Sequence, residues 1–137
     1  MEKMLGARKE AILQAVDQEG TVIQEYRALF TIRALADAET RLGKSVGNAL
    51  QGFVTGRSGV RELAILLMFG MEAERRTRKG GGDPVSFDEA CEVIEMVGIE
   101  QTATILGPAI TDVLQYPKKQ ETAQEEEQPE EPAEEKN

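Results

Sequence analysis

The chain offers few side chains of the kind that carry out catalysis or bind metal ions. It contains no histidine and a single cysteine, Cys91, among its 137 residues. Histidine is the most frequent general base and zinc ligand near neutral pH, and one cysteine forms neither an internal disulfide nor a cysteine-based metal site. The neighbouring carboxylates of Asp88 and Glu89 fit the start of a helix better than a general acid and base. We therefore expect a protein that is not an enzyme, with no catalytic residues, no cofactor and no metal site.

A run of cations beside glycines is the other group that could do chemistry, because such a pair can bind phosphate. Arg75, Arg76, Arg78 and Lys79 stand directly before Gly80-Gly81-Gly82. In a phosphate-binding loop the glycines come before the helix, so that its first N–H groups face the anion, and here the order is reversed. We interpret the cations as the last turn of a helix, where they offset its dipole, and the glycines as its end.

The balance of charge excludes further classes of function. Sixteen Lys and Arg stand against 25 Asp and Glu, a net charge of -9, which argues against a nucleic-acid binder that neutralises phosphates. The longest uninterrupted apolar stretch, residues 63–69, is far shorter than the roughly 20 residues that a membrane span needs. Residues 1–6 lack the apolar segment of a signal peptide. We expect a soluble, cytoplasmic protein that contacts neither nucleic acid nor membrane.

The acidity is concentrated at one end and suggests a domain boundary. Residues 118–137 contain eight Glu, three Lys and two prolines, and their only apolar residues are two alanines. Such a segment cannot bury enough apolar surface to offset the entropy lost on ordering. We expect a folded domain over residues 1–117 and a disordered acidic tail over residues 118–137, which acts as a solubilising appendage or attracts a basic partner.

The first 30 residues allow two structures. Residues 11–16 and 21–29 flank the turn-forming sequence Asp17-Gln18-Glu19-Gly20, a spacing typical of a β-hairpin. Residues 2–18 are also rich in good helix formers, so a first helix is the local alternative.

After this unit the sequence predicts a mainly α (α+β) fold, a small helical domain of about four helices with a possible N-terminal hairpin. Thr31, Ser45 and Ser58 are placed to cap helices, and Ser86 with Glu89 forms a capping box. A kink is expected at Pro108 in the last helix. The segments with helical spacing of apolar residues are 31–42, 46–54, 60–78, 86–98 and 100–115.

Two apolar features of these helices bear on function. Residues 63–69 are apolar on every side for nearly two turns, so they must be covered all round, by their own domain or in part by another chain. Cys91 shares the apolar register of Phe87 and Ile94, which favours burial over reactivity.

Several motifs together resemble one family. The stretch from Phe30 to Glu39, followed by Leu42-Gly43-Lys44-Ser45-Val46, resembles the opening of the tail assembly chaperones of long-tailed phages and gene transfer agents. In that family a short strand precedes a helix with a Glu just before a Leu-x-Gly turn. Leu66-Leu67-Met68-Phe69-Gly70-Met71 is similar to the apolar-Gly-Leu step that follows, and Ser86-Phe87-Asp88-Glu89-Ala90 with Gly98 and the closing helix resembles its last third. The similarity covers about residues 26–114, whereas the triglycine and the acidic tail depart from the compact family core.

The resemblance implies a small helical protein that takes part in virion assembly without catalysis. It would bind the tape measure protein of a phage, prophage or gene transfer agent in the bacterial cytoplasm, keep it soluble and help the tail tube protein assemble around it. A homo-oligomer stays open.

A client of this kind would bind through apolar helix surface. A tape measure protein is long, helical and rich in apolar seams, so its chaperone needs an apolar groove, which the segments 60–78 and 100–115 could supply. The candidate contact residues are Leu66, Phe69, Met71, Ile110 and Leu114. The alternative is an acidic regulatory or nucleic-acid-mimic protein that binds a basic partner with a steep salt dependence.

Overall fold

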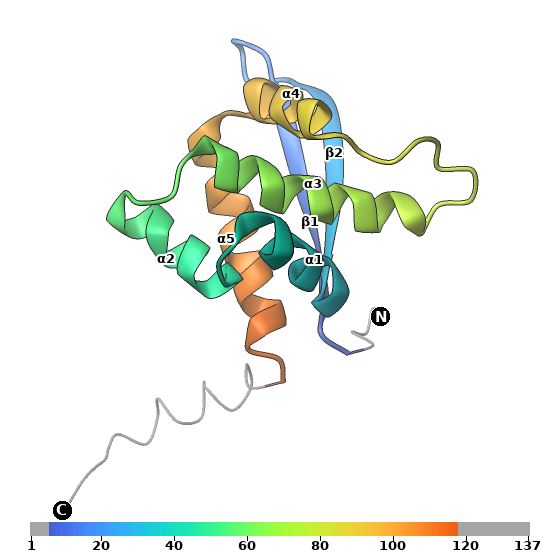
Figure 1. The fold of residues 1–137 in the computed structure, drawn as a ribbon. Coiled ribbons are helices and arrows are strands. Elements are labelled where there is room, and N and C mark those ends of the chain that lie inside the picture. The colour runs from blue at the N-terminus through green and yellow to red at the C-terminus, as the bar shows by residue number, and fades with distance from the viewer. Residues whose placement is uncertain (1–5, 118–137) are drawn as a thin grey trace, which may run out of the picture.

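A computed structural model describes residues 6–117, in which a β-hairpin precedes five helices (Figure 1). Strand β1 (Arg8–Val16) pairs antiparallel with β2 (Val22–Thr31) in a two-stranded sheet. Ala11, Leu13 and Ala15 are buried while the residues between them are exposed, so β1 has the period of two that a half-buried strand requires. The hairpin prediction is confirmed, and the alternative of a helix there is wrong for the described residues.

Five helices follow in the described part of the chain, one at each of the five segments with helical spacing, compared with the expected total of about four. Glycines end the first two helices: Gly43 follows the first and Gly56 the second, with φ of 75° and 83°, in the left-handed region. The mainly α fold with an N-terminal hairpin is confirmed. The helices are α1 (Ile32–Leu42), α2 (Val46–Thr55), α3 (Val60–Arg76), α4 (Phe87–Val97) and α5 (Ile99–Leu114).

Side-chain caps begin three of these helices as predicted. The hydroxyls of Thr31, Ser45 and Ser86 each accept a hydrogen bond from a backbone N–H three residues on, at 3.0 Å. The prediction that Ser58 caps α3 is wrong. The N-cap is Gly59, whose N–H donates to the carboxylate of Glu62 at 2.8 Å.

The side chain of Ser58 instead stabilises the loop between α2 and α3. Its hydroxyl donates to the carbonyl of Ala49 at 2.8 Å, across the last turn of α2. The backbone N–H of Ser58 also donates to the carbonyl of Gly52, at 3.1 Å. Both hydrogen bonds hold the loop against the end of α2, so Ser58 does not cap α3.

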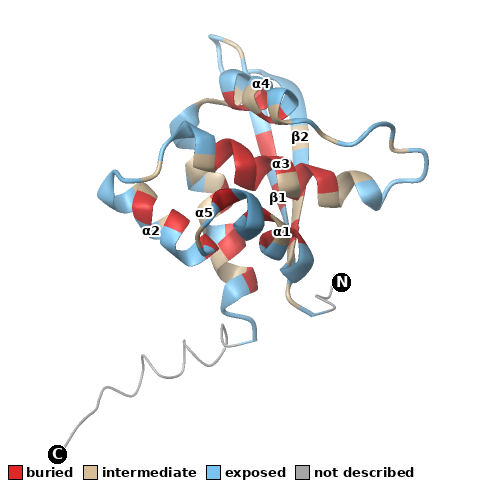
Figure 2. Ribbon diagram, in the orientation of Figure 1, coloured by how far each residue is buried: buried red, intermediate tan, exposed pale blue. Residues whose placement is uncertain are grey.

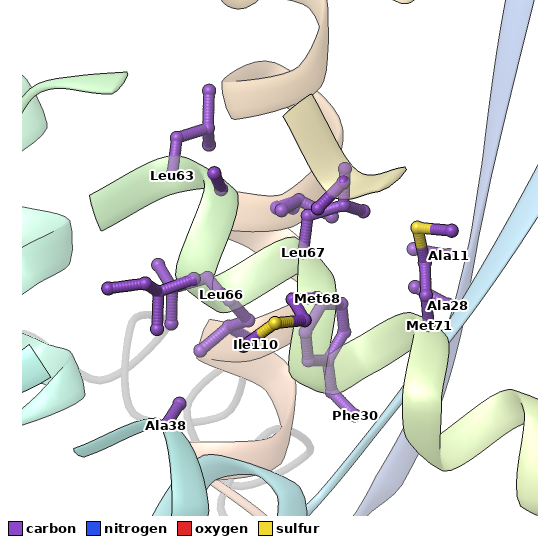
Figure 3. Close-up of a cluster of buried hydrophobic side chains, with 14 of the residues drawn as sticks. Ala11, Ala28, Phe30, Ala38, Leu63, Leu66, Leu67, Met68, Met71 and Ile110 are labelled. Atoms are coloured by element: carbon purple, nitrogen blue, oxygen red, sulfur yellow. The ribbon is translucent and has the colours of Figure 1, made fainter. Parts of the chain in front are cut away.

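Helix α3 lies at the centre of the domain, across the hairpin and beside α1, α4 and α5 (Figure 1). Every residue from Leu63 to Met68 is buried, at most 7% exposed, so the chain itself covers the stretch that is apolar on all sides (Figure 2). Phe30 from β2 and Ile110 from α5 reach the same cluster (Figure 3). Helix α3 approaches β2 closely because position 70 is glycine: a Cβ there would lie 2.6 Å from the Phe30 ring.

Two further expectations concern Pro108 and Cys91. Helix α5 continues through Pro108, and the kink expected there stays a prediction. Cys91 is half-buried and packs against the core, so it is only partly buried. The predicted disordered tail, residues 118–137, lies outside the described residues. Within the described residues, no helix is long and apolar enough to cross a membrane.

Candidate functional site

An apolar groove between α2, α3 and α5 is the surface feature best suited to binding another chain. It encloses about 460 Å³, and none of the residues that line it carries a charge. Leu63 and Leu66 of α3, which are buried, and Leu106 of α5 form its floor. At its sides Val54 is 81% exposed and Leu114 is 46% exposed. The groove is thus an opening in the hydrophobic core with exposed apolar side chains at its rim.

Helix α2 supplies one wall because its apolar residues face in two directions. Ala49 and Gly52 are buried against the domain, while Leu50, Phe53 and Val54 line the groove. The last three occur at spacings of three and four, so they share one side of the helix. A helix with apolar residues over such a wide arc has more apolar surface than its own domain covers.

Helix α5 supplies the opposite wall. Ala103, Gly107, Thr111 and Leu114 line the groove at spacings of four, four and three, which places them along one stripe. The stripe combines small residues with one large side chain at the end of the helix.

The position of α2 depends on a carboxylate from α1. Oε2 of Glu39 accepts a hydrogen bond from the backbone N–H of Val46 at 2.8 Å, at the first turn of α2. A negative charge at a helix N-terminus is stabilised by the helix dipole and satisfies an N–H group that the helix leaves free. Together with Ser45, Glu39 therefore fixes where the wall of the groove begins.

The five predicted contact residues do not form one surface. Leu66 and Leu114 both line the groove, one in its floor and the other at its rim. Ile110 is fully buried in the core. Phe69 lies in a separate hollow beside α1, and Met71 lies in hollows near Tyr26. Helix α3 is surrounded on all sides, so its neighbouring residues face different parts of the domain. The predicted contact residues on α3 therefore lie in different environments.

Sequence reasoning missed the wall from α2. Leu50 and Phe53 lie at helical spacing within the predicted segment 46–54, but that spacing is also typical of residues buried in a core. Val54 next to Phe53 is the signal that could have revealed the groove. Two adjacent large apolar residues on a helix point about 100° apart, so one short helix cannot easily hide both.

Three of the four cations before the triglycine pair with carboxylates of α3. Arg75 donates to both carboxylate oxygens of Glu72, at 2.9 and 2.6 Å, and Arg76 donates to the same carboxylate at 2.8 Å. The hydrogen bond from Arg75 is the main cause that lowers the pKa of Glu72 from 4.5 to about 2. Arg78 donates to Glu74 at 3.1 Å. These contacts fit the interpretation as a helix end rather than a phosphate site.

Neither models of protein families nor curated proteins nor solved structures match this chain. In the described residues, no three Cys, Asp or Glu side chains gather in a way that could hold a metal ion. The groove and the motifs around it are therefore the features that bear on function.

Proposed function

We propose that this protein is a tail assembly chaperone of a long-tailed phage, prophage or gene transfer agent. It binds the tape measure protein in the bacterial cytoplasm and promotes assembly of the tail tube protein around it. The single observation that carries the proposal is the uncharged groove between α2, α3 and α5. The apolar stripe of an amphipathic client helix can lie in such a groove with its polar side in solvent.

The exposure of the rim fits a client that is bound and later released. Fully burying a Val or Leu side chain contributes about 1.5–3 kcal/mol, so Val54, at 81% exposed, can gain most of that amount and Leu114, at 46% exposed, about half. Two such contacts give only modest affinity, which grows when a client presents several apolar residues in succession. A long helical protein meets this requirement, and a folded globular surface does not.

The geometry around Glu39 also supports the proposal. The family motif has a Glu just before a Leu-x-Gly turn. This chain differs in detail, since Gly43 follows Leu42 directly and Glu39 stands three residues before Leu42, yet Glu39 spans the turn at Gly43 to cap α2. Since α2 forms one wall of the groove, Glu39 helps to shape the proposed binding surface.

Coexpression with the tape measure protein tests the proposal. The expected result is that the soluble fraction of the tape measure protein rises when this chain is present, and that the two proteins purify together. Equal insolubility of the client with and without this chain would contradict the chaperone function.

Variants of the rim connect the effect to the groove. Val54→Gln with Leu114→Gln removes exposed apolar surface at the groove, and we expect it to abolish most of the gain in client solubility. The matched control is Val60→Gln with Ile99→Gln, since these residues are 46% and 54% exposed and do not line the groove. A control pair that is as harmful as the groove pair would show that binding occurs elsewhere.

The salt dependence distinguishes the alternative of an acidic mimic. Binding in an apolar groove persists at high ionic strength, whereas binding of a basic cleft by carboxylates weakens steeply over the same range. Copurification with the tape measure protein at high salt is therefore the outcome expected for the chaperone.

A further inference from the structure

Strand β2 has one edge that pairs with no other strand of the described chain. Helix α5 packs beside β1, so β2 is the outer strand of the two-stranded sheet (Figure 1). Among the described residues, no backbone hydrogen bond outside the hairpin involves residues 22–30. Every second residue of an antiparallel strand directs its N–H and C=O away from the neighbouring strand, so β2 presents unpaired groups along this edge.

The open edge of β2 is accessible to another chain. Residues 22–25 are exposed, and a hollow of about 400 Å³ lies beside Glu25, Tyr26 and Arg27, between β2 and the segment that joins α3 to α4. Ile23 is 54% exposed and has no partner on β1, because the pairing of the strands shifts at a bulge there. A strand from a second molecule can extend a sheet at an edge of this kind.

The side chains on the outer face of β2 are complementary to those of the same strand in reverse. Ile23, Glu25, Arg27 and Leu29 alternate along the strand with residues that face the core. In an antiparallel pair, opposite residues direct their backbone groups both toward each other or both away, so two copies of one strand pair odd-numbered residues with odd-numbered ones. A two-fold axis between the copies must therefore pass through a residue.

The charges on β2 favour one position for that axis. An axis at Glu25 or at Arg27 would set that residue opposite its own copy, and like charges directly opposite destabilise a strand pair. An axis at Tyr26 sets Glu25 opposite Arg27 of the second copy, twice, and Ile23 opposite Leu29, twice. Pairs of opposite charge and pairs of apolar side chains both stabilise neighbouring strands.

We infer that two copies of this chain associate through β2 into a continuous four-stranded antiparallel sheet, with a two-fold axis at Tyr26. The partner is a second copy because the complementarity belongs to the strand itself, as an isologous interface requires. The inference does not rest on the proposed function, since none of the residues that line the groove belongs to the hairpin. The dimer carries the groove twice.

Two charge reversals test the interface and its register. Glu25→Arg sets arginines opposite each other at both contacts, and Arg27→Glu does the same with glutamates. We expect each variant alone to dimerise about tenfold more weakly than the unmodified chain in sedimentation equilibrium. In a mixture of the two variants, one copy contributes two arginines and the other two glutamates. The heterodimer should therefore recover an affinity within about threefold of the unmodified dimer.

Disulfide trapping measures the register directly. The background is Cys91→Ser, and a chain with Glu25→Cys is mixed with a chain with Arg27→Cys. Opposite residues have Cβ atoms about 4.5–5.5 Å apart, close enough to form a disulfide with small adjustments. Two copies of the same cysteine variant would lie on a diagonal, about 7–8 Å apart. We expect the mixture to form covalent dimers several-fold faster than either variant alone.

A control on β1 separates pairing at the edge from packing of two hairpins face to face. Ile12→Lys with Val16→Lys changes exposed apolar residues on the outer face of β1, 39% and 51% exposed, and leaves the edge of β2 as it is. We expect this pair to leave the dimer unchanged. Circular dichroism checks that every variant keeps its helical content.

Four outcomes overturn the inference. They are an unmodified chain that stays monomeric up to about 1 mM, a mixture of the charge variants that dimerises no better than each alone, equal rates of disulfide formation, and a dimer that the control on β1 dissociates. None of them bears on client binding, which Val54→Gln with Leu114→Gln tests separately.

Discussion

Glu72 and Arg75 form the shortest ion pair among the described residues, with 2.6 Å between Oε2 of Glu72 and Nη2 of Arg75. A second hydrogen bond, from Nε of Arg75 to Oε1, makes the contact bidentate at 2.9 Å. The N–H of Val85 donates to the same carboxylate, and Nη1 of Arg75 donates to the carbonyl of Gly82. The pair thus ties the segment between α3 and α4 back onto α3.

Replacing Glu72 tests how much this connection contributes. Glu72→Gln removes the charge that two arginines and a backbone N–H share, so we expect the free energy of unfolding to fall by about 2 kcal/mol at neutral pH. Urea unfolding followed by circular dichroism measures the change. Asp37→Asn is the control: Arg33 in that pair is 79% exposed, and we expect a loss below about 0.5 kcal/mol.

The pH dependence of the same variant has a defined sign. The pKa of Glu72 is lowered from 4.5 to about 2 in the folded chain, mainly by the hydrogen bond from Arg75. The ionised carboxylate therefore stabilises the fold above pH 4.5, and this contribution is lost as the pH falls from 4.5 toward 2. We expect the stability difference between the unmodified chain and Glu72→Gln to shrink over that range. A difference independent of pH would contradict this account.

Gly70→Ala tests the close approach of α3 to β2. The added Cβ would lie 2.6 Å from two carbons of the Phe30 ring, a ring that is fully buried and cannot move aside freely. We expect a loss of about 2 kcal/mol in the free energy of unfolding. Gly47→Ala is the matched control in α2, where the nearest atom lies 4.0 Å away, and it should leave stability unchanged or raise it by up to about 1 kcal/mol. Thermal unfolding of the two variants would show whether the order is as expected.

Glu39→Ala tests the cap on α2. Without the carboxylate, the N–H of Val46 loses its side-chain partner, and we expect a cost of about 1 kcal/mol. The loss should be local, so hydrogen exchange is the suitable measurement: amides in the first turn of α2 should exchange faster, with little change in α5. Uniformly faster exchange through the domain would assign Glu39 a global role instead.

Much of the fold follows from local signals in the sequence. Thr31, Ser45 and Ser86 cap helices because a short hydroxyl side chain satisfies an N–H that the helix leaves free, and such a signal needs no tertiary information. Ser58 shows the limit of this reasoning. Its hydroxyl is taken by the carbonyl of Ala49, a partner nine residues away, and Glu62 caps α3 through Gly59.

The candidate site was harder to predict because exposure is a tertiary property. Ile110 and Leu114 belong to the same apolar stripe, yet one is fully buried and the other is nearly half exposed. The difference depends on which helix packs over each turn, and the type of a side chain does not indicate whether another helix covers it. Val54 was missed for the same reason.

The junction between β2 and α1 has no spare length, since the strand ends at Thr31 and the helix begins at Ile32. A tilt of the hairpin is therefore passed on to α1, because no linker residue lies between the two elements to absorb it. Extra residues would be accommodated far more easily at the Asp17–Thr21 turn, where they lengthen the tip of the hairpin and leave the junction of β2 and α1 unchanged.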